Sequence, residues 1–226
     1  MSVGIILGSR PRSIATVKAA ALPQAFRLGA TRIPNEYYPT PPEATRALLS
    51  VEAFDGSIWE PACGEGAIAS VLTEAGHKVV ATDLVDYGYG IPRVDFLKET
   101  RPRAKHIVTN PPYGSGLADA FIDRSLRFAA ETGGNVAMLL NLASLAHRTR
   151  TRWWREHTPA RLYAIDDIVC WPERHYGPPP SHFTKHRYVW AVWTQYHKGP
   201  SAFWWLSSAE FRQRQSILNN KKRRSS

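Results

Sequence analysis

The sequence predicts an α/β fold, in which a mostly parallel sheet is covered by helices on both faces and ends in an antiparallel hairpin. Two observations lead to this prediction. Strand-like apolar runs alternate with helical patterns along the first part of the chain, as in folds built on a parallel sheet. The last two strand candidates, 161–171 and 187–196, have only a short loop between them, which favours antiparallel pairing at the sheet edge.

The elements follow from local patterns. After the proline-rich start of 35–52, Ala44, Ala47, Leu48 and Val51 recur at helical spacing. Further helices are expected over 67–76, which Gly76 ends, and over 116–131. Short apolar runs without this spacing predict the remaining strands at 56–60, 78–84, 105–110 and 135–141.

The composition suits one domain, and its charge is concentrated in the two tails. The chain has 226 residues and a formal charge of +10, a size that supports a sizeable core. Residues 1–32 carry five basic side chains and no acid, and the last eight residues carry four more. Such tails contact polyanions or are simply solvated. An organelle-targeting segment is an alternative for the first tail. No apolar run approaches membrane-spanning length, and two cysteines fit a reducing compartment such as the cytoplasm.

A glycine loop indicates a nucleoside cofactor. Gly64 and Gly66 lie between a strand and a helix, where free backbone N–H groups and the lack of side chains admit a ligand closely. Asp83 ends the next strand and is suited to accept hydrogen bonds from ribose hydroxyls. With Ala69, the glycines also fit the dinucleotide fingerprint, so a nicotinamide oxidoreductase is one alternative and a purely structural turn is another.

Glu60 and Pro61, just before the glycines, favour a different cofactor. A carboxylate there would repel a pyrophosphate but would suit a cationic ligand with an amino-acid end. S-adenosyl-L-methionine is a positively charged adenosine compound that ends in methionine. It is therefore the expected cofactor.

The stretch "TNPPYG" (109–114) gives this site its chemistry. Asn110 follows a strand whose carboxyl end should lie beside those that precede Glu60 and Asp83. The two prolines stiffen the corner, so the Asn110 side-chain oxygen and the Pro111 carbonyl could accept both hydrogens of an exocyclic amine. Tyr113 offers a face on which a planar base or amide can stack. A plain asparagine–proline turn is the alternative.

These motifs, in this order, make the chain resemble class I S-adenosylmethionine-dependent methyltransferases, and more narrowly the phage and prophage type of DNA adenine-N6 methyltransferases. The resemblance covers about 35–197 and rests on "YYPTPPEATRALL", "WEPACGEGAIASVL", "ATDL", "VDF" and "TNPPYG". It implies a Rossmann-like seven-stranded sheet with an antiparallel last strand and a bacterial or phage-infected cell as the setting. The implied catalytic residues are Asn110, Pro111, Pro112 and Tyr113. The implied cofactor-binding residues are Tyr38, Thr40, Glu60, Pro61, Ala62, Gly64, Gly66, Asp83, Leu84, Asp95, Phe96 and Asn110.

Three parts are then expected: a basic tail over 1–34, the methyltransferase domain over 35–200, and a C-terminal extension with a basic tail over 201–226. Little of the chain is free to form a target-recognition domain, so RNA adenine and protein glutamine stay open as substrates beside DNA. A nucleic-acid-binding module with an inactive cofactor site is a further alternative.

Arginines interleaved with tryptophans over 145–161, and basic residues in the loop over 171–188, predict contacts with nucleic acid. An amphipathic helix with buried tryptophans is the alternative for the first stretch. The histidines of the loop do not form a metal-binding pattern, so no metal is expected. The candidate nucleic-acid contacts are Arg148, Arg150, Arg152, Trp153, Arg174, Lys185 and Arg187.

Overall fold

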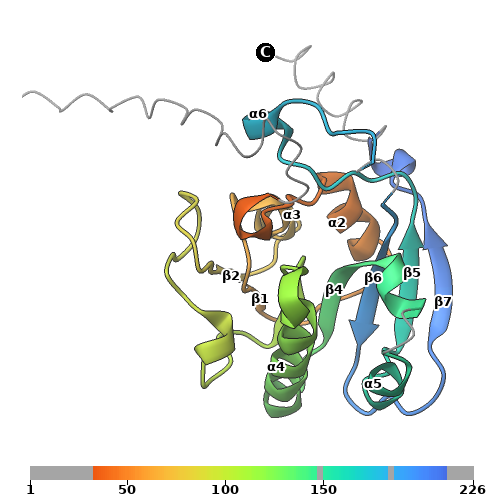
Figure 1. Ribbon diagram of the computed structural model, residues 1–226. Coiled ribbons are helices and arrows are strands. Elements are labelled where there is room, and N and C mark those ends of the chain that lie inside the picture. The colour runs from red at the N-terminus through yellow and green to blue at the C-terminus, as the bar shows by residue number, and fades with distance from the viewer. Residues whose placement is uncertain (1–32, 147–149, 183–185, 213–226) are drawn as a thin grey trace, which may run out of the picture. The chain divides into compact units, whose positions relative to one another are not determined.

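The fold is built on one seven-stranded sheet of mixed direction (Figure 1). The computed structural model describes residues 33–146, 150–182 and 186–212. The strand order is β2-β1-β3-β4-β6-β5-β7. The strands are β1 (Ile58–Glu60), β2 (Val79–Ala81), β3 (His106–Thr109), β4 (Val136–Asn141), β5 (Arg161–Ile165), β6 (Tyr188–Trp193) and β7 (Ala202–Leu206).

The pairing confirms the predicted fold class and adds one strand that local patterns missed. β1, β2, β3 and β4 pair in parallel, whereas β6 pairs antiparallel with both β4 and β5. The predicted hairpin is therefore present, formed by β5 and β6. β7 then pairs in parallel with β5 on the outer side, so the antiparallel strand is the sixth, β6, and not the last one as the resemblance implies. Residues 202–206 escaped prediction because their aromatic side chains show no period-2 alternation with polar residues.

Two helical layers cover the sheet and enclose two hydrophobic clusters. α2 (Pro42–Leu49) and α3 (Ala67–Glu74) pack on one face, and α4 (Leu117–Thr132) and α5 (Thr151–Glu156) pack on the other. α2 ends at Leu49, so Val51 is 45% exposed and does not continue the buried stripe that its spacing predicts. The remaining helices are η1 (Pro34–Glu36), η2 (Phe96–Lys98), η3 (Gly114–Gly116), η4 (Leu142–Ala146) and α6 (Glu173–Tyr176).

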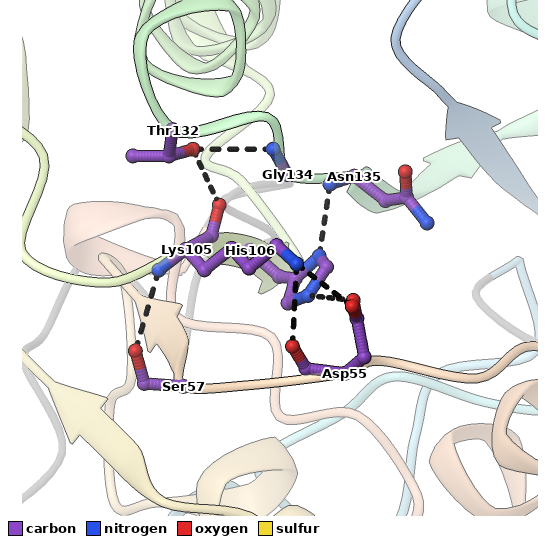
Figure 2. Close-up of polar contacts among 7 residues, drawn as sticks. All are labelled: Asp55, Ser57, Lys105, His106, Thr132, Gly134 and Asn135. Atoms are coloured by element: carbon purple, nitrogen blue, oxygen red, sulfur yellow. Dashed lines mark hydrogen bonds and ion pairs between the residues drawn. The ribbon is translucent and has the colours of Figure 1, made fainter.

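A polar network joins the strands at the amino end of the sheet (Figure 2). His106 is 1% exposed; its Nδ1 accepts a hydrogen bond from the Asn135 backbone N–H (2.9 Å), and its Nε2 faces Asp55 Oδ1 at 3.1 Å. Because Nδ1 accepts, the single proton of the neutral ring is on Nε2 and points at the carboxylate. Burial lowers the pKa of His106, and the Asp55 carboxylate opposes that effect. The network holds β3 against the start of β4, far along the strands from the cavity described below.

Within the described part of the chain, no helix is both long and apolar enough to cross a bilayer. The same residues contain no group of three or more histidine, cysteine, aspartate or glutamate side chains placed to hold a metal ion.

Candidate functional site

The carboxyl ends of β1 and β3 and the loop after β2 meet at one cavity of about 290 Å³. Glu60, Asp83 and Asn110 all line it, as expected for neighbouring parallel strands whose carboxyl ends share one edge of a sheet. Nearly all of the predicted cofactor-binding residues line the same cavity: Tyr38, Thr40, Glu60, Pro61, Ala62, Gly64, Asp83, Leu84, Asp95, Phe96 and Asn110. Sequence positions far apart thus form one concave site, which is the usual form of a small-molecule pocket.

The Asp83 carboxylate accepts a hydrogen bond from the backbone of the glycine loop. The Gly64 N–H donates to Asp83 Oδ2 and the Val85 N–H donates to Oδ1, both at 2.8 Å. Burial raises the pKa of Asp83, while these backbone N–H groups act in the opposite direction. Gly66, the residue before α3, has φ +83°, and a Cβ there would lie 2.6 Å from the Tyr89 ring. The backbone conformation therefore favours glycine at 66, and any side chain there would also require the Tyr89 ring to move.

Glu60 is the most unusual group in the cavity. It is 2% exposed, and the Ala69 backbone N–H hydrogen-bonds to its carboxylate. Among the described residues, its Oε2 has no hydrogen-bond partner. Burial and, less strongly, the nearby Asp83 raise the pKa of Glu60 well above its ordinary value of 4.5. A buried acceptor oxygen without a donor is costly, and a cationic ligand with N–H groups would supply what it lacks. The residues present therefore fit S-adenosylmethionine.

The far end of the cavity is lined by Val94, Asp95, Phe96 and Leu84. Asp95 Oδ1 accepts from the Leu97 N–H at 3.1 Å and so caps η2. Phe96 is only 2% exposed, with its ring centroid 5.0 Å from that of Trp59, so much of the ring serves the core. Leu84 is 61% exposed and lies at the rim.

The Asn110 corner is held by the segment before α2 and by Tyr113. Asn110 Nδ2 donates to the Tyr38 carbonyl oxygen (2.9 Å) and to Thr40 Oγ1 (3.1 Å). The Tyr113 hydroxyl lies 2.5 Å from Asn110 Oδ1, to which it donates, and 2.9 Å from the Leu139 carbonyl oxygen. Pro111 is buried, and Pro112 lines the cavity.

The sequence predicted a use for the Tyr113 ring but not for its hydroxyl. The ring packs against both hydrophobic clusters, and burial raises the pKa of the hydroxyl well above its ordinary value. The hydroxyl contact with Asn110 is thus a new finding, whereas stacking of a base on this ring stays a prediction.

Two aromatic residues in the cavity wall were missed by sequence reasoning. Tyr37 and Tyr87 stack with ring centroids 4.6 Å apart, and both line the cavity. Burial raises the pKa of Tyr87 to about 12. His175 of α6 contacts Glu65 of the glycine loop, so α6 lies beside the glycine loop. Of the two tyrosines, only Tyr37 could have been found from the sequence, because it adjoins the "YPTP" motif.

Part of the basic stretch contacts the rest of the protein. Arg150 contacts Asp119, and its guanidinium lies 5.1 Å from the Trp153 ring centroid and 4.9 Å from that of Trp154. Both tryptophans pack against the cluster between the sheet, α4 and α5. Arg150 and Trp153 thus have partners within the protein, as the amphipathic alternative expects, and their contact with nucleic acid stays a prediction.

The other candidate nucleic-acid contacts divide into two groups. Arg152, Arg174 and Arg187 are exposed; Arg152 also pairs with Glu156 one turn along α5. Arg187 lines a second hollow near the ends of β4, β5 and β7, beside the 76% exposed Trp205. Arg148 and Lys185 lie outside the described residues, as do the basic residues of both tails.

The comparisons place this geometry in a known class of fold. No protein-family model matches the sequence, and neither does any curated protein. Solved structures do match: a protein of Listeria monocytogenes assigned to the class I S-adenosylmethionine-dependent methyltransferases aligns with a TM-score of 0.53 and 13% identity, over 78% of this chain and 68% of that chain. A Vibrio vulnificus YJ016 protein described as the modification subunit of a type I restriction enzyme aligns with a TM-score of 0.54 and 15% identity. That match covers 87% of this chain and 55% of the other. The chain therefore has the Rossmann-like fold of class I methyltransferases.

Proposed function

We propose that the chain is a DNA adenine-N6 methyltransferase that binds S-adenosylmethionine in the cavity at the ends of β1, β2 and β3. The observation that carries the proposal is the joint placement of Glu60, Asp83 and Asn110 around this cavity. A nicotinamide oxidoreductase would have to seat a pyrophosphate beside the buried Glu60, and it would leave the Asn110 corner without a role.

The protein's own groups would bind and orient the two substrates. Glu60 would take the cationic amino-acid end of the cofactor, Asp83 the ribose, and Asp95 with Phe96 the adenine ring. S-adenosylmethionine, when bound, supplies an electrophilic methyl group on a positively charged sulfur. The Asn110 side-chain oxygen and the Pro111 carbonyl would accept the two amine hydrogens of the target base and so keep its lone pair free. The extra proton leaves to solvent after transfer, so positioning and electrostatics suffice without a strong base.

Contacts with the DNA backbone are assigned to the exposed arginines Arg152, Arg174 and Arg187, together with the basic residues of 1–32 and of the last eight positions. A salt titration of DNA binding tests this assignment. Each of the three Arg→Ala changes should lower the salt slope by roughly one unit per lost phosphate contact. Arg101→Ala is the matched control, because Arg101 is also exposed but precedes the amino end of β3. Equal slopes for all four variants would remove these arginines from the interface.

The deciding experiment is transfer of labelled methyl groups from S-adenosylmethionine. Unmethylated double-stranded DNA, total RNA and a protein extract are offered side by side, and the modified product is digested and identified. Label on the N6 position of adenine in DNA is the expected result, and Asn110→Ala should abolish it while cofactor affinity changes little. Label on RNA adenine or on glutamine would replace DNA as the substrate and leave the chemistry unchanged. Absence of label in every substrate, with the cofactor bound, would refute the proposed activity.

A further inference from the structure

The Asn110 side chain makes three hydrogen bonds that together fix which way its amide points. Nδ2 donates to the Tyr38 carbonyl oxygen at 2.9 Å and to Thr40 Oγ1 at 3.1 Å, while Oδ1 accepts from the Tyr113 hydroxyl. The partners come from a segment about 70 positions earlier in the chain and from the next turn of the corner itself.

Only one orientation of the amide satisfies these partners. A backbone carbonyl oxygen accepts hydrogen bonds and cannot donate them. Turning the Asn110 amide over would place its oxygen 2.9 Å from the Tyr38 carbonyl oxygen, so two acceptors would face each other in a partly buried place. The Tyr113 hydroxyl can serve either orientation, since its hydrogen can go to the Leu139 carbonyl instead. The Tyr38 carbonyl therefore decides the orientation, and Thr40 supports it.

The segment that carries these two groups is itself stiff. Thr40 lies between Pro39 and Pro41, whose rings fix their own φ and restrict the residue before them. Thr40 is 3% exposed, and its side chain also hydrogen-bonds to the buried Cys170. The Thr40 oxygen is thus held in position before any substrate arrives.

We propose that Thr40 and the Tyr38 carbonyl are positioning groups that lock Asn110 with its oxygen as the only free hydrogen-bonding function, so that the site accepts a substrate that donates N–H at the reacting atom. Both Nδ2 hydrogens are used by the protein, and one lone pair of Oδ1 is left over. An exocyclic amine or a primary amide meets this requirement, whereas a carbonyl oxygen, such as O4 of thymine or O6 of guanine, does not. This inference rests on the proposed function and gives Thr40 a role different from cofactor contact.

Thr40→Val tests the positioning role, because it replaces the hydroxyl with a methyl group of similar size. We expect kcat for methyl transfer to fall by about tenfold, which corresponds to the loss of the one hydrogen bond between Thr40 and Asn110. The cofactor Kd should change less than kcat. Thr40→Ser should rescue most of the loss. The matched control is Thr45→Val in α2: Thr45 is fully buried, and its Oγ1 has no hydrogen-bond partner within the described residues. A loss of cofactor affinity in Thr40→Val with kcat unchanged would overturn the proposal and make Thr40 a cofactor ligand.

Asn110→Asp tests whether the orientation of the Asn110 side chain matters, because the variant keeps a side-chain oxygen but loses the amide nitrogen. The new carboxylate would face the Tyr38 carbonyl with a second acceptor, so we expect poor turnover at neutral pH and partial recovery in more acidic buffer. Recovery follows because a protonated carboxyl can donate where the amide nitrogen did. Turnover equal to that of the unchanged protein at neutral pH would contradict the locked orientation.

A measurement on the full chain that needs no activity distinguishes failure of this inference from failure of the proposed function. The side-chain amide hydrogens of Asn110, followed by nitrogen-15 NMR, should exchange with solvent slowly, and Thr40→Val should speed that exchange whereas Thr45→Val should not. Slow exchange in a protein that methylates nothing would uphold the orientation and refute the function. Exchange as fast as in an exposed asparagine would refute the orientation, whatever the activity.

Discussion

Glu60→Gln is the perturbation that most directly tests how the cavity recognises its cofactor. The change keeps the shape of the side chain and removes its charge. Since Glu60 Oε2 is buried and has no partner among the described residues, it is free to accept a charge-assisted hydrogen bond from a cationic ligand. Such a bond contributes roughly 1.5–3 kcal/mol, which corresponds to a rise in Kd of about 10- to 150-fold.

The pH dependence follows from the raised pKa of Glu60. In the free protein the carboxyl holds its proton to higher pH than an exposed glutamate, and a bound cation favours the ionised form. Binding therefore releases a proton wherever the free protein is protonated, so affinity should weaken as pH falls, by up to about tenfold per pH unit. Glu60→Gln should remove this dependence. The variant should also unfold no more easily than the unchanged protein, because its neutral amide removes the cost of ionising a buried carboxyl close to Asp83.

Calorimetric titrations with three ligands make the test specific. S-adenosylmethionine and S-adenosylhomocysteine both carry the amino-acid end, and 5′-methylthioadenosine lacks it. The first two should lose affinity in Glu60→Gln and the third should not. If 5′-methylthioadenosine is weakened as much as the others, or if the cofactor binds the variant as tightly as before at every pH, the reasoning about Glu60 is wrong.

Three further predictions concern stability. His106→Gln should reduce the loss of unfolding free energy between pH 7 and pH 5. The lowered pKa of His106 keeps its ring neutral in the folded state, so the stability that it contributes is present above about pH 6.5 and is lost as the pH falls. If urea unfolding shows the same loss of free energy between the two pH values for both proteins, this reasoning is wrong. Glu52→Gln should cost about 1–3 kcal/mol, seen as a lower Tm, because the buried carboxylate accepts from Arg161 and Tyr163; an unchanged Tm would mean the pairing is neutral. Gly66→Ala should lower the free energy of chemical unfolding more than Gly76→Ala does. Both glycines have a positive φ, which costs an alanine about 1–3 kcal/mol, but only at 66 would the new Cβ meet another residue. Equal losses of unfolding free energy in the two variants would exclude the clash.

The sequence by itself determined the features that depend on local geometry. Local patterns placed α2, α3 and α4, apolar runs placed six of the seven strands, and the short connection before β6 predicted its antiparallel pairing. The residues at strand ends could be predicted to meet because parallel strands end at one edge. The sequence alone therefore assigns Glu60, Asp83 and Asn110 to one site.

The tertiary structure alone decided which partner each polar group takes. Nothing in the local pattern shows that Arg150 pairs with Asp119, or that the Thr40 hydroxyl meets Asn110. β7 forms a strand because β5 offers it a free edge, whatever its own alternation. Hydrogen bonds between distant segments depend on how the layers pack, which local spacing does not encode. The orientation of the Asn110 amide, and with it the chemistry proposed for this site, therefore comes from the fold and not from the motif.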